Sequence, residues 1–275
     1  MRQLPKDVNE VVERALQVSR GVDGFLGDAE ARFLGILAAC APAEGVIVEI
    51  GSYKGKSTVL LASVAAHCGL GPVVAIDPHT GPSVTDPKLG PGASSFEEFI
   101  GALRSAKLEE QVEVHRAFSR EVAQGWNRAI RLLWIDGDHT YEGTKEDFEL
   151  FSPYLANGAI VALHDALHAY EGPIRVFVEQ ILRSHRFGPA GFVQSVAWAQ
   201  FRPDDGPRFR EQRGRLARRA NRLLAFLKDS RPLHGWAKLR YKLARSRVPR
   251  SPISADDWYV LVARNAADLP KKPNQ

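Results

Sequence analysis

Val46-Ile-Val-Glu-Ile-Gly-Ser-Tyr-Lys-Gly-Lys-Ser-Thr58 is the stretch of the sequence that decides the fold. A short apolar run containing Glu49 passes through two glycines, Gly51 and Gly55, into a segment of helical character. A strand, a glycine turn and a helix N-terminus form a site for a nucleotide-like ligand. Glycine lets the backbone approach the ligand, and the unpaired N–H groups of the helix attract electron-rich atoms. The stretch therefore predicts a ligand site at the start of an α/β sheet.

Three kinds of nucleotide ligand compete for this turn. A phosphate-binding P-loop needs four residues between its glycines, whereas Gly51 and Gly55 enclose three. A dinucleotide fingerprint needs Gly-x-Gly-x-x-Gly, and Tyr53 stands where its second glycine belongs. S-adenosylmethionine carries a positive sulfonium and a positive amino group, which favour a carboxylate where a triphosphate would be repelled. Glu49 suits this third ligand best.

Three further apolar segments end in polar residues. Val73-Val-Ala-Ile-Asp77 ends in a carboxylate, at the position from which an acidic residue accepts ribose hydroxyls in doubly wound folds. Capping of a turn is the structural alternative for this residue. The segment from Ile130 to Glu142 ends in carboxylates around His139, and Gly158-Ala-Ile-Val-Ala-Leu-His-Asp165 ends in a His-Asp pair. Ligands of open α/β sheets bind beyond the carboxyl ends of the strands, so we expect these groups to converge on one crevice.

Together these motifs resemble those of class I S-adenosylmethionine-dependent methyltransferases. The chain is similar to the branch of small-molecule and sugar O-methyltransferases marked by Ile-Asp-Gly-Asp-His-x-Tyr, here Ile135 to Tyr141, and by a later His-Asp pair. The likeness covers residues 24 to 202, and it departs at Asn157-Gly158-Ala159, where the family usually has two adjacent glycines. The resemblance implies methyl transfer to a hydroxyl of a small molecule, with a sugar, a glycolipid precursor or a natural-product glycoside favoured.

The resemblance also assigns cofactor contacts to the strand ends. Glu49 and the glycine turn would hold the methionine end of S-adenosylmethionine, and Asp77 would hold the ribose. Ser119 would lie near the adenine, and a helix N-cap is the alternative for its side chain. The expected cofactor-binding residues are Glu49, Gly51, Ser52, Tyr53, Gly55, Ser57, Asp77, Ser119 and Asp136.

The acceptor is expected near His139, which is the first choice of general base because a histidine with a pKa of about 6.5 suits proton abstraction at neutral pH. Asp136 and Asp138 are its expected catalytic partners. In similar metal-dependent O-methyltransferases, metal ligands follow the fourth and fifth strands, which here are Asp136, His164 and Asp165. Such a metal would bind substrate oxygens and lower the pKa of the hydroxyl. Mg²⁺ prefers oxygen ligands, so His164 leaves open whether Mg²⁺, another divalent metal or none is bound.

The spacing of apolar residues predicts a Rossmann-like, doubly wound α/β fold, with a mostly parallel sheet and helices on both faces. Strands are expected near 46–50, 72–76, 111–115, 130–136, 158–163 and 192–201. Helices are expected near 28–41, with Asp28 as the cap, and near 56–68, 95–106, 143–155 and 173–184. The segment from Pro78 to Ser94 is long for an α/β connection and is expected to be a lid or substrate loop.

Charge divides the chain into two parts. Residues 204–275 contain 18 Lys+Arg and 7 Asp+Glu, a net charge of +11, whereas residues 1–203 contain 19 and 25, a net charge of −6. We therefore expect a methyltransferase domain in residues 1–203 and a basic, mainly helical extension in residues 204–275. A basic helix is expected from Arg208 to Lys228, and the capping box Ser254-Ala-Asp-Asp257 is expected to open a terminal helix.

The basic helix has three interpretations. Packing on the core or in an oligomer is favoured, an anionic membrane surface comes second, and nucleic acid is the least favoured because no RNA-binding signature accompanies the helix. The sequence has neither a long apolar run nor a charged-then-apolar leader. We therefore expect a cytoplasmic homo-oligomer whose tail is a candidate contact to the inner membrane face.

Two functions of other classes stay open. Gly55-Lys56-Ser57 and the Walker-B-like Leu132-Leu-Trp-Ile-Asp136 are compatible with a P-loop nucleotide hydrolase. The basic tail is compatible with an adaptor that binds a membrane or nucleic acid. At 275 residues, with 44% hydrophobic and 25% charged residues, the chain can bury a full core as one domain with an appendage.

Overall fold

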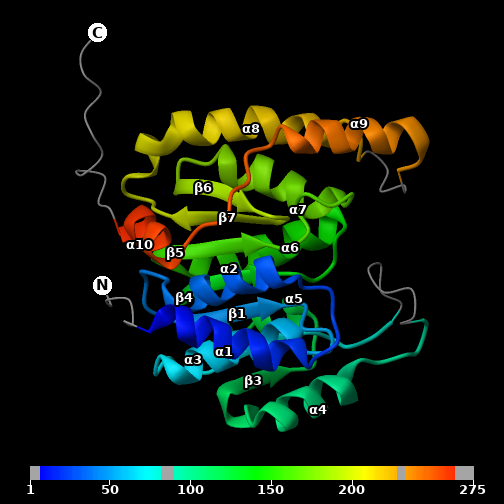
Figure 1. The fold of residues 1–275 in the computed structure, drawn as a ribbon, viewed down its shortest axis with the longest axis vertical. Coiled ribbons are helices and arrows are strands. Elements are labelled where there is room, and N and C mark those ends of the chain that lie inside the picture. Colours follow the sequence, from blue (N-terminus) through cyan, green and yellow to red (C-terminus); the bar gives the residue numbers. More distant parts are fainter. Residues whose placement is uncertain (1–6, 82–89, 228–232, 264–275) are drawn as a thin grey trace.

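A computed structural model describes residues 7–81, 90–227 and 233–263, and within these ranges the centre of the molecule is a seven-stranded sheet (Figure 1). The strand order is β3-β2-β1-β4-β5-β7-β6. The strands are β1 (Val46–Ile50), β2 (Val73–Ile76), β3 (Val112–His115), β4 (Ile130–Ile135), β5 (Leu155–Leu163), β6 (Phe187–Val193) and β7 (Val196–Phe201). The first five strands are parallel, and β7 runs antiparallel to both of its neighbours. The predicted mostly parallel α/β sheet is confirmed.

Helices cover both faces of this sheet, because successive residues of each buried strand point to opposite sides. In β1, for example, Ile47 belongs to one hydrophobic cluster and Val48 to the other. The first cluster includes residues of α1 (Val8–Arg20), α2 (Asp28–Ala39), α3 (Lys56–His67), α4 (Phe96–Ala106) and α10 (Ala255–Ala263). The second includes residues of α5 (Ser119–Ala123), α6 (Tyr141–Phe151), α7 (Glu171–Val176) with the π-helical turn Phe177–Leu182, α8 (Arg210–Leu224) and α9 (Gly235–Ser246).

The chain changes direction across the sheet between β1 and β4. β2 and β3 lie on one side of β1, and β4 and β5 lie on the other, which makes the β1/β4 junction the switch point where open α/β sheets bind ligands. Ile50 pairs with Ile76 of β2 and with Ile135 of β4, so these strands end at the same edge. The residues that follow them therefore gather at that edge.

The structure corrects several expected elements. The single strand over 192–201 is wrong, since this segment holds the end of β6, a turn at Gln194 and β7. Asp28 does not cap α2, because Gly27 occupies the N-cap position and its N–H donates to Glu30. Two helices, α1 and α9, were not expected. The predicted loop from Pro78 to Ser94 includes residues 82–89, which lie outside the described residues.

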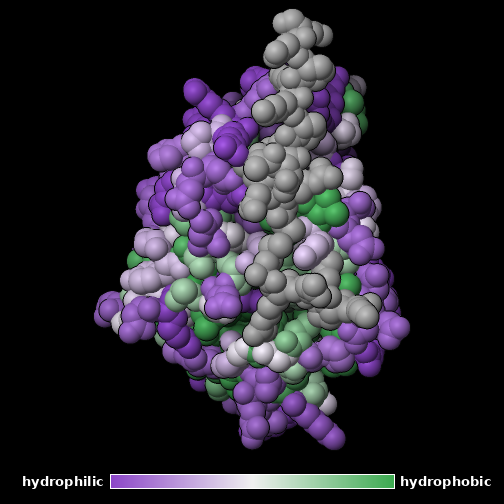
Figure 2. All heavy atoms as spheres, turned by 90° about the vertical axis from the view of Figure 1, so that its left-hand side faces the viewer, coloured by the Kyte–Doolittle hydropathy of each residue, from purple (hydrophilic) through white to green (hydrophobic). Residues whose placement is uncertain are grey.

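The basic segment after residue 203 begins with α8, which corresponds to the helix expected from Arg208 to Lys228. Arg213 of this helix is buried and donates to the backbone carbonyls of Ser184, Phe187 and Gly206. Figure 1 shows α8 and α9 along the upper end of the molecule, and the same end carries mostly hydrophilic residues in the side view of Figure 2. None of the helices in the described ranges has the length and apolar character needed to cross a membrane.

The terminal helix α10 packs against the sheet. Trp258 is fully buried, with its ring 5.5 Å from that of Phe33 and 4.8 Å from that of Trp198. The predicted capping box is confirmed, because Asp257 donates its N–H to Ser254 and accepts the hydroxyl of Ser254 in return. The tail helices thus contribute to the same core, and the division of the chain at residue 203 stays a prediction.

Candidate functional site

The glycine turn after β1 fits tightly against the turn after β4. Gly51 has a φ of 88°, and a Cβ at this position would lie 2.3 Å from the carbonyl oxygen of Asp136, so only glycine is accommodated. Beyond it, the N–H groups of Ser52 and Tyr53 each donate to Oδ2 of Asp77 at 2.8 Å. Tyr53 itself has a left-handed φ of 48°, a strained conformation of the kind that gathers at functional sites.

The two carboxylate oxygens of Asp77 accept hydrogen bonds from different parts of the backbone at this edge of the sheet. Its Oδ2 holds the glycine turn, and its Oδ1 accepts the N–H of His79 at 2.6 Å. A carboxylate has about four lone-pair positions, so three backbone donors leave room for a ligand hydroxyl. The turn-capping alternative is therefore confirmed, and a ribose contact stays compatible with it.

Two adjoining cavities open at the strand ends. The larger, of about 490 Å³, extends from Gly51 past Asp77 to Ser119, and the smaller, of about 240 Å³, extends from the glycine turn to the ends of β4 and β5. Gly51, Tyr53, Asp136 and His139 line both of them. The volume of the larger cavity lies within the range of small-molecule sites in proteins. The predicted cofactor residues that line the two cavities are Gly51, Ser52, Tyr53, Ser57, Asp77, Ser119 and Asp136.

Glu49 and Gly55 lie behind these walls. Gly55 is the N-cap of α3 with a φ of 93°. Glu49 is fully buried and accepts the hydroxyl of Thr58, and burial raises the pKa of Glu49 to about 7 against the effect of that hydrogen bond. Its Oε1 and the hydroxyl of Ser52 are buried and make no hydrogen bond of good geometry, although Ser57 and Ser52 lie close enough to Glu49 to oppose the rise of its pKa. Because buried polar atoms are normally paired, these two orphans fit a polar ligand such as the amino-acid end of S-adenosylmethionine.

The far end of the larger cavity contains a residue that sequence reasoning did not place there. Asp147 of α6 is buried beside Ser119, and burial raises the pKa of Asp147 to about 6 while hydrogen bonding by Ser119 opposes the shift. Ser119 is the first residue of α5 and makes no capping hydrogen bond, because Phe118 occupies the N-cap position. The N-cap alternative for Ser119 is wrong.

His139 lies where the loop after β4 meets the loop after β5. Its Nε2 is 3.6 Å from Oδ1 of Asp136 and 3.5 Å from Oδ2 of Asp165, and its ring contacts that of Tyr170 at 4.7 Å. The side chain is 4% exposed, yet neither ring nitrogen makes a hydrogen bond. The backbone fixes this position, since the N–H of Gly172 donates to the carbonyl of His139 at 3.0 Å. The Nδ1 atom of His139 therefore has no partner, whereas its Nε2 lies within ion-pair distance of two carboxylates that orient the ring.

A chain of buried charges supports Asp136 from behind. Nδ1 of His164 is 2.9 Å from Oδ1 of Asp136, and Nε2 of His164 is 3.4 Å from Oε2 of Glu30. Burial opposes the charge on His164, but the two carboxylates outweigh burial and hold the pKa of His164 well above its usual value. Burial likewise acts to raise the pKa of Glu30, but hydrogen bonds from His164 and Ser195 lower it to about 2. Sequence reasoning missed Glu30 and Ser195.

The predicted metal ligands Asp136, His164 and Asp165 do not fit a metal ion. Both ring nitrogens of His164 face carboxylates, which leaves it no lone pair for coordination. Among the described residues, no group of three or more His, Cys, Asp or Glu side chains is arranged to hold a metal. Asp138, an expected catalytic partner of His139, accepts hydrogen bonds from the N–H and the hydroxyl of Thr140 instead. No step is derived through a metal.

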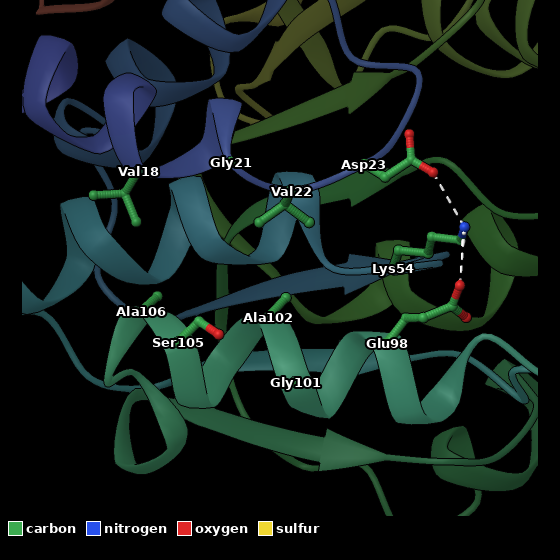
Figure 3. Close-up of a pocket in the computed structure, with 10 residues that line it drawn as sticks. All are labelled: Val18, Gly21, Val22, Asp23, Lys54, Glu98, Gly101, Ala102, Ser105 and Ala106. Atoms are coloured by element: carbon green, nitrogen blue, oxygen red, sulfur yellow. Dashed lines mark hydrogen bonds and ion pairs between the residues drawn. The ribbon is translucent and has the colours of Figure 1, made fainter.

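Another cavity, of about 530 Å³, lies away from the strand-end carboxylates, between α4 and the loop after α1 (Figure 3). Figure 3 shows Lys54 between Asp23 and Glu98, at 3.1 and 3.0 Å. These ion pairs tie the loop after α1 to α4. The same loop continues to Gly24 and Phe25, which line the smaller strand-end cavity, and the ring of Phe25 stacks on Tyr53. The ion pairs beside this cavity therefore help to hold the loop that lines the smaller strand-end cavity.

The P-loop interpretation is wrong. The two N–H groups that would cradle a phosphate already donate to Asp77, and the ammonium of Lys56 is directed to the carbonyl of Gly24 at 3.5 Å. A negative carboxylate inside the turn would repel a phosphate.

Comparison with known proteins agrees with this geometry. Residues 48–166 match the family described as Methyltransferase domain. Among solved structures, the O-methyltransferase NovP superposes with a TM-score of 0.56 at 15% sequence identity, covering 71% of this chain and 100% of NovP. The cofactor-bound structure of Rv0187 from MTB superposes with a TM-score of 0.50 at 18% identity, covering 71% of this chain and 91% of that one. Residues 48–166 are therefore similar to a methyltransferase domain, and the chain shares the α/β fold of these solved structures.

Proposed function

We propose that the protein transfers a methyl group from S-adenosylmethionine to a hydroxyl oxygen of a small molecule. The observation that carries this proposal is His139, a buried base that lines both strand-end cavities and whose Nε2 lies between the carboxylates of Asp136 and Asp165. The fold likeness to NovP, which is an O-methyltransferase, supports an oxygen acceptor. A sugar, a glycolipid precursor or a natural-product glycoside is the proposed acceptor, and the strand-end motifs support this choice by their resemblance to sugar O-methyltransferases.

The two cavities divide the cofactor between them in this proposal. Asp77 holds the ribose, and Ser119 with Asp147 borders the adenine in the larger cavity. The orphan atoms of Glu49 and Ser52 bind the methionine end. A cationic amino group close to Glu49 would lower the pKa of that carboxyl again, because an opposite charge favours its ionised form.

His139 performs the proton transfer. When bound, S-adenosylmethionine supplies the methyl group that the acceptor oxygen takes from its sulfur. His139 accepts the hydroxyl proton on a ring nitrogen, and the carboxylates of Asp136 and Asp165 stabilise the resulting imidazolium. His164 and Glu30 hold Asp136 in place, so that His139 stays aligned with the acceptor.

An assay with isotopically labelled S-adenosylmethionine tests this function. The protein is incubated with the donor and with a panel of sugars, glycosides and glycolipid precursors, and the products are analysed by mass spectrometry. The expected result is S-adenosylhomocysteine together with a product that has gained one methyl group on oxygen. Calorimetric binding of ATP without any affinity for S-adenosylmethionine would contradict the proposal.

Replacing Asp77 with alanine is expected to weaken cofactor binding by about 1 to 3 kcal/mol, the scale for losing a charged hydrogen-bond partner. The change removes both the ribose acceptor and the anchor of the glycine turn. Calorimetry with S-adenosylhomocysteine measures the effect, and Asp28→Asn at the exposed start of α2 is the matched control. If Asp77→Ala binds S-adenosylhomocysteine as tightly as the wild type, Asp77 does not contact the cofactor.

Chelation is expected to leave turnover unchanged. His164 already pairs with two carboxylates, so the predicted ligand set lacks its third member. The measurement is the methylation rate after dialysis against EDTA, with and without added Mg²⁺. A loss of activity that Mg²⁺ restores would reinstate Asp136 and Asp165 as metal ligands.

We also propose that the outer face of α9 contacts an anionic membrane surface. Trp236, Leu239 and Leu243 lie on one side of this helix and are 80%, 55% and 57% exposed. An exposed apolar stripe in a segment of net charge +11 suits a surface of anionic lipids. The cytoplasmic location, with contact at the inner membrane face, and the homo-oligomer stay predictions.

Flotation with vesicles tests the membrane proposal. We expect the protein to float with phosphatidylglycerol vesicles and not with phosphatidylcholine vesicles, and the Trp236→Ala/Leu243→Ala double variant to lose most of this binding. Val260→Ala, at a 45% exposed apolar position on α10, is the control and should float like the wild type. Equal recovery of the double variant and the wild type would exclude this face of α9.

A further inference from the structure

A third cavity next to His139, of about 520 Å³, lies between α9 and the loop that follows β5. His139 lines this cavity as well as both cofactor cavities, and Tyr170 and His168 line it together with the smaller of the two. A molecule in the third cavity therefore lies against His139 even while the cofactor cavities are filled. The proposed acceptor enters from this side.

The wall formed by α9 is basic. Lys238, Lys242 and Arg245 line the cavity from one face of the helix, at the spacing that places side chains above one another. Glu171 is the acidic residue in the lining, and its carboxylate pairs with Arg175 at 2.8 Å. No ion pair of Lys238 or Lys242 is found within the described ranges. The cavity thus presents positive charge that the described residues leave unneutralised.

The basic wall is held firmly in place. Tyr241 is 4% exposed, and its hydroxyl donates to the backbone carbonyls of Leu167 and His168 at 3.1 and 2.5 Å. The guanidinium of Arg245 donates to the same carbonyl of Leu167 at 3.2 Å. These bonds fasten α9 to the loop after β5, which also carries Asp165 beside His139. The distance between the basic wall and the base is therefore set by the fold, as positioning of an acceptor requires.

From these observations we infer that the acceptor carries a phosphate or diphosphate group, which binds Lys238 and Lys242 while a hydroxyl elsewhere in the same molecule faces His139. Tyr170, Leu233 and Tyr241 supply apolar surface between the two ends for the body of the molecule. The inference rests on the proposed function, since it names the substrate class of the same site. In this inference α9 of the basic tail binds the acceptor's phosphate group, and this role is separate from any membrane contact.

Binding of inorganic pyrophosphate tests the anion site without any methyl transfer. Pyrophosphate is titrated by calorimetry into the full-length protein saturated with S-adenosylhomocysteine. The double variant Lys238→Gln/Lys242→Gln is expected to raise the dissociation constant about tenfold, because two partly exposed ion pairs together amount to about one factor of ten. The control Arg240→Gln/Arg247→Gln makes the same charge change at positions that do not line the cavity, and it should bind like the wild type. Equal weakening in both double variants, or no binding by the wild type, would overturn the inference.

Paired acceptors separate this inference from the proposed function. Hydroxylated compounds are compared with their phosphate esters, and lipid-linked and nucleotide-linked sugar diphosphates are each compared with the free sugar. We expect at least tenfold higher kcat/KM for the phosphorylated member of each pair, with the difference lost in Lys238→Gln/Lys242→Gln and kept in the control. Equal methylation of both members would overturn the anionic acceptor and leave the methyltransferase function intact. Lysine-dependent pyrophosphate binding without methylation of any compound would support the anion site and count against O-methylation.

Discussion

Replacing His139 with alanine is expected to lower turnover by about 10²- to 10⁴-fold, the usual contribution of a general base, while the affinity for S-adenosylmethionine stays nearly the same. His139 is the buried imidazole that meets all three cavities, and its Nε2 lies between the carboxylates of Asp136 and Asp165. Single-turnover rates and cofactor calorimetry measure the two quantities separately.

His185→Ala is the control for this prediction, because His185 is exposed and lies far along the chain from the strand-end loops. Added imidazole should partly restore turnover in His139→Ala, since the deleted side chain leaves a space at the junction of the cavities. Wild-type turnover in His139→Ala would move the base to Asp136 or Asp165.

Replacing Glu30 with glutamine is expected to lower the free energy of unfolding by about 3 to 5 kcal/mol at neutral pH, because it leaves the buried charge of His164 with one partner fewer. Glu30 also accepts the N–H of Ser195 at 3.1 Å, so it joins α2 to the turn between β6 and β7. The loss should appear as a lower midpoint in denaturant unfolding. Asp28→Asn, in the same helix turn but paired with Arg20 at the surface, is the control and should stay close to the wild-type midpoint.

The pH dependence of the same comparison has a defined sign. The pKa of Glu30 is about 2 in the folded protein, compared with about 4.5 in the unfolded chain. A lowered pKa contributes stability that is present above the unfolded value and is lost as the pH falls through the folded value. The difference in the free energy of unfolding between the wild type and Glu30→Gln should therefore have its full size above pH 4.5 and become smaller as the pH falls towards 2. A gap of constant size across this range would show that the charge of Glu30 is not what stabilises the fold.

The strands of the parallel part of the sheet were predictable because they are short apolar runs with distinctive ends. Each of the first five strands was located within a few residues, and the residues that follow them meet at one edge because the strands are parallel. The β6–β7 hairpin was missed because its turn, at Gln194, carries no glycine or asparagine in the sequence to mark it.

The candidate site was predictable where a residue follows its own strand. Asp77, Asp136 and His139 gather for this reason. Glu30 and Asp147 were missed because their roles depend on which helix covers which strand end, and local sequence does not contain that information. The surroundings of the expected metal ligands could not be predicted for the same reason, since Glu30 comes from α2 to pair with the second nitrogen of His164.

A crystal structure of the protein with S-adenosylhomocysteine and a phosphorylated acceptor tests the central claim most directly. We predict the ribose against Asp77, the amino-acid end next to the orphan atoms of Glu49 and Ser52, and the acceptor hydroxyl within hydrogen-bonding distance of His139. An empty strand-end crevice, or a cofactor bound away from Asp77 and His139, would contradict the account.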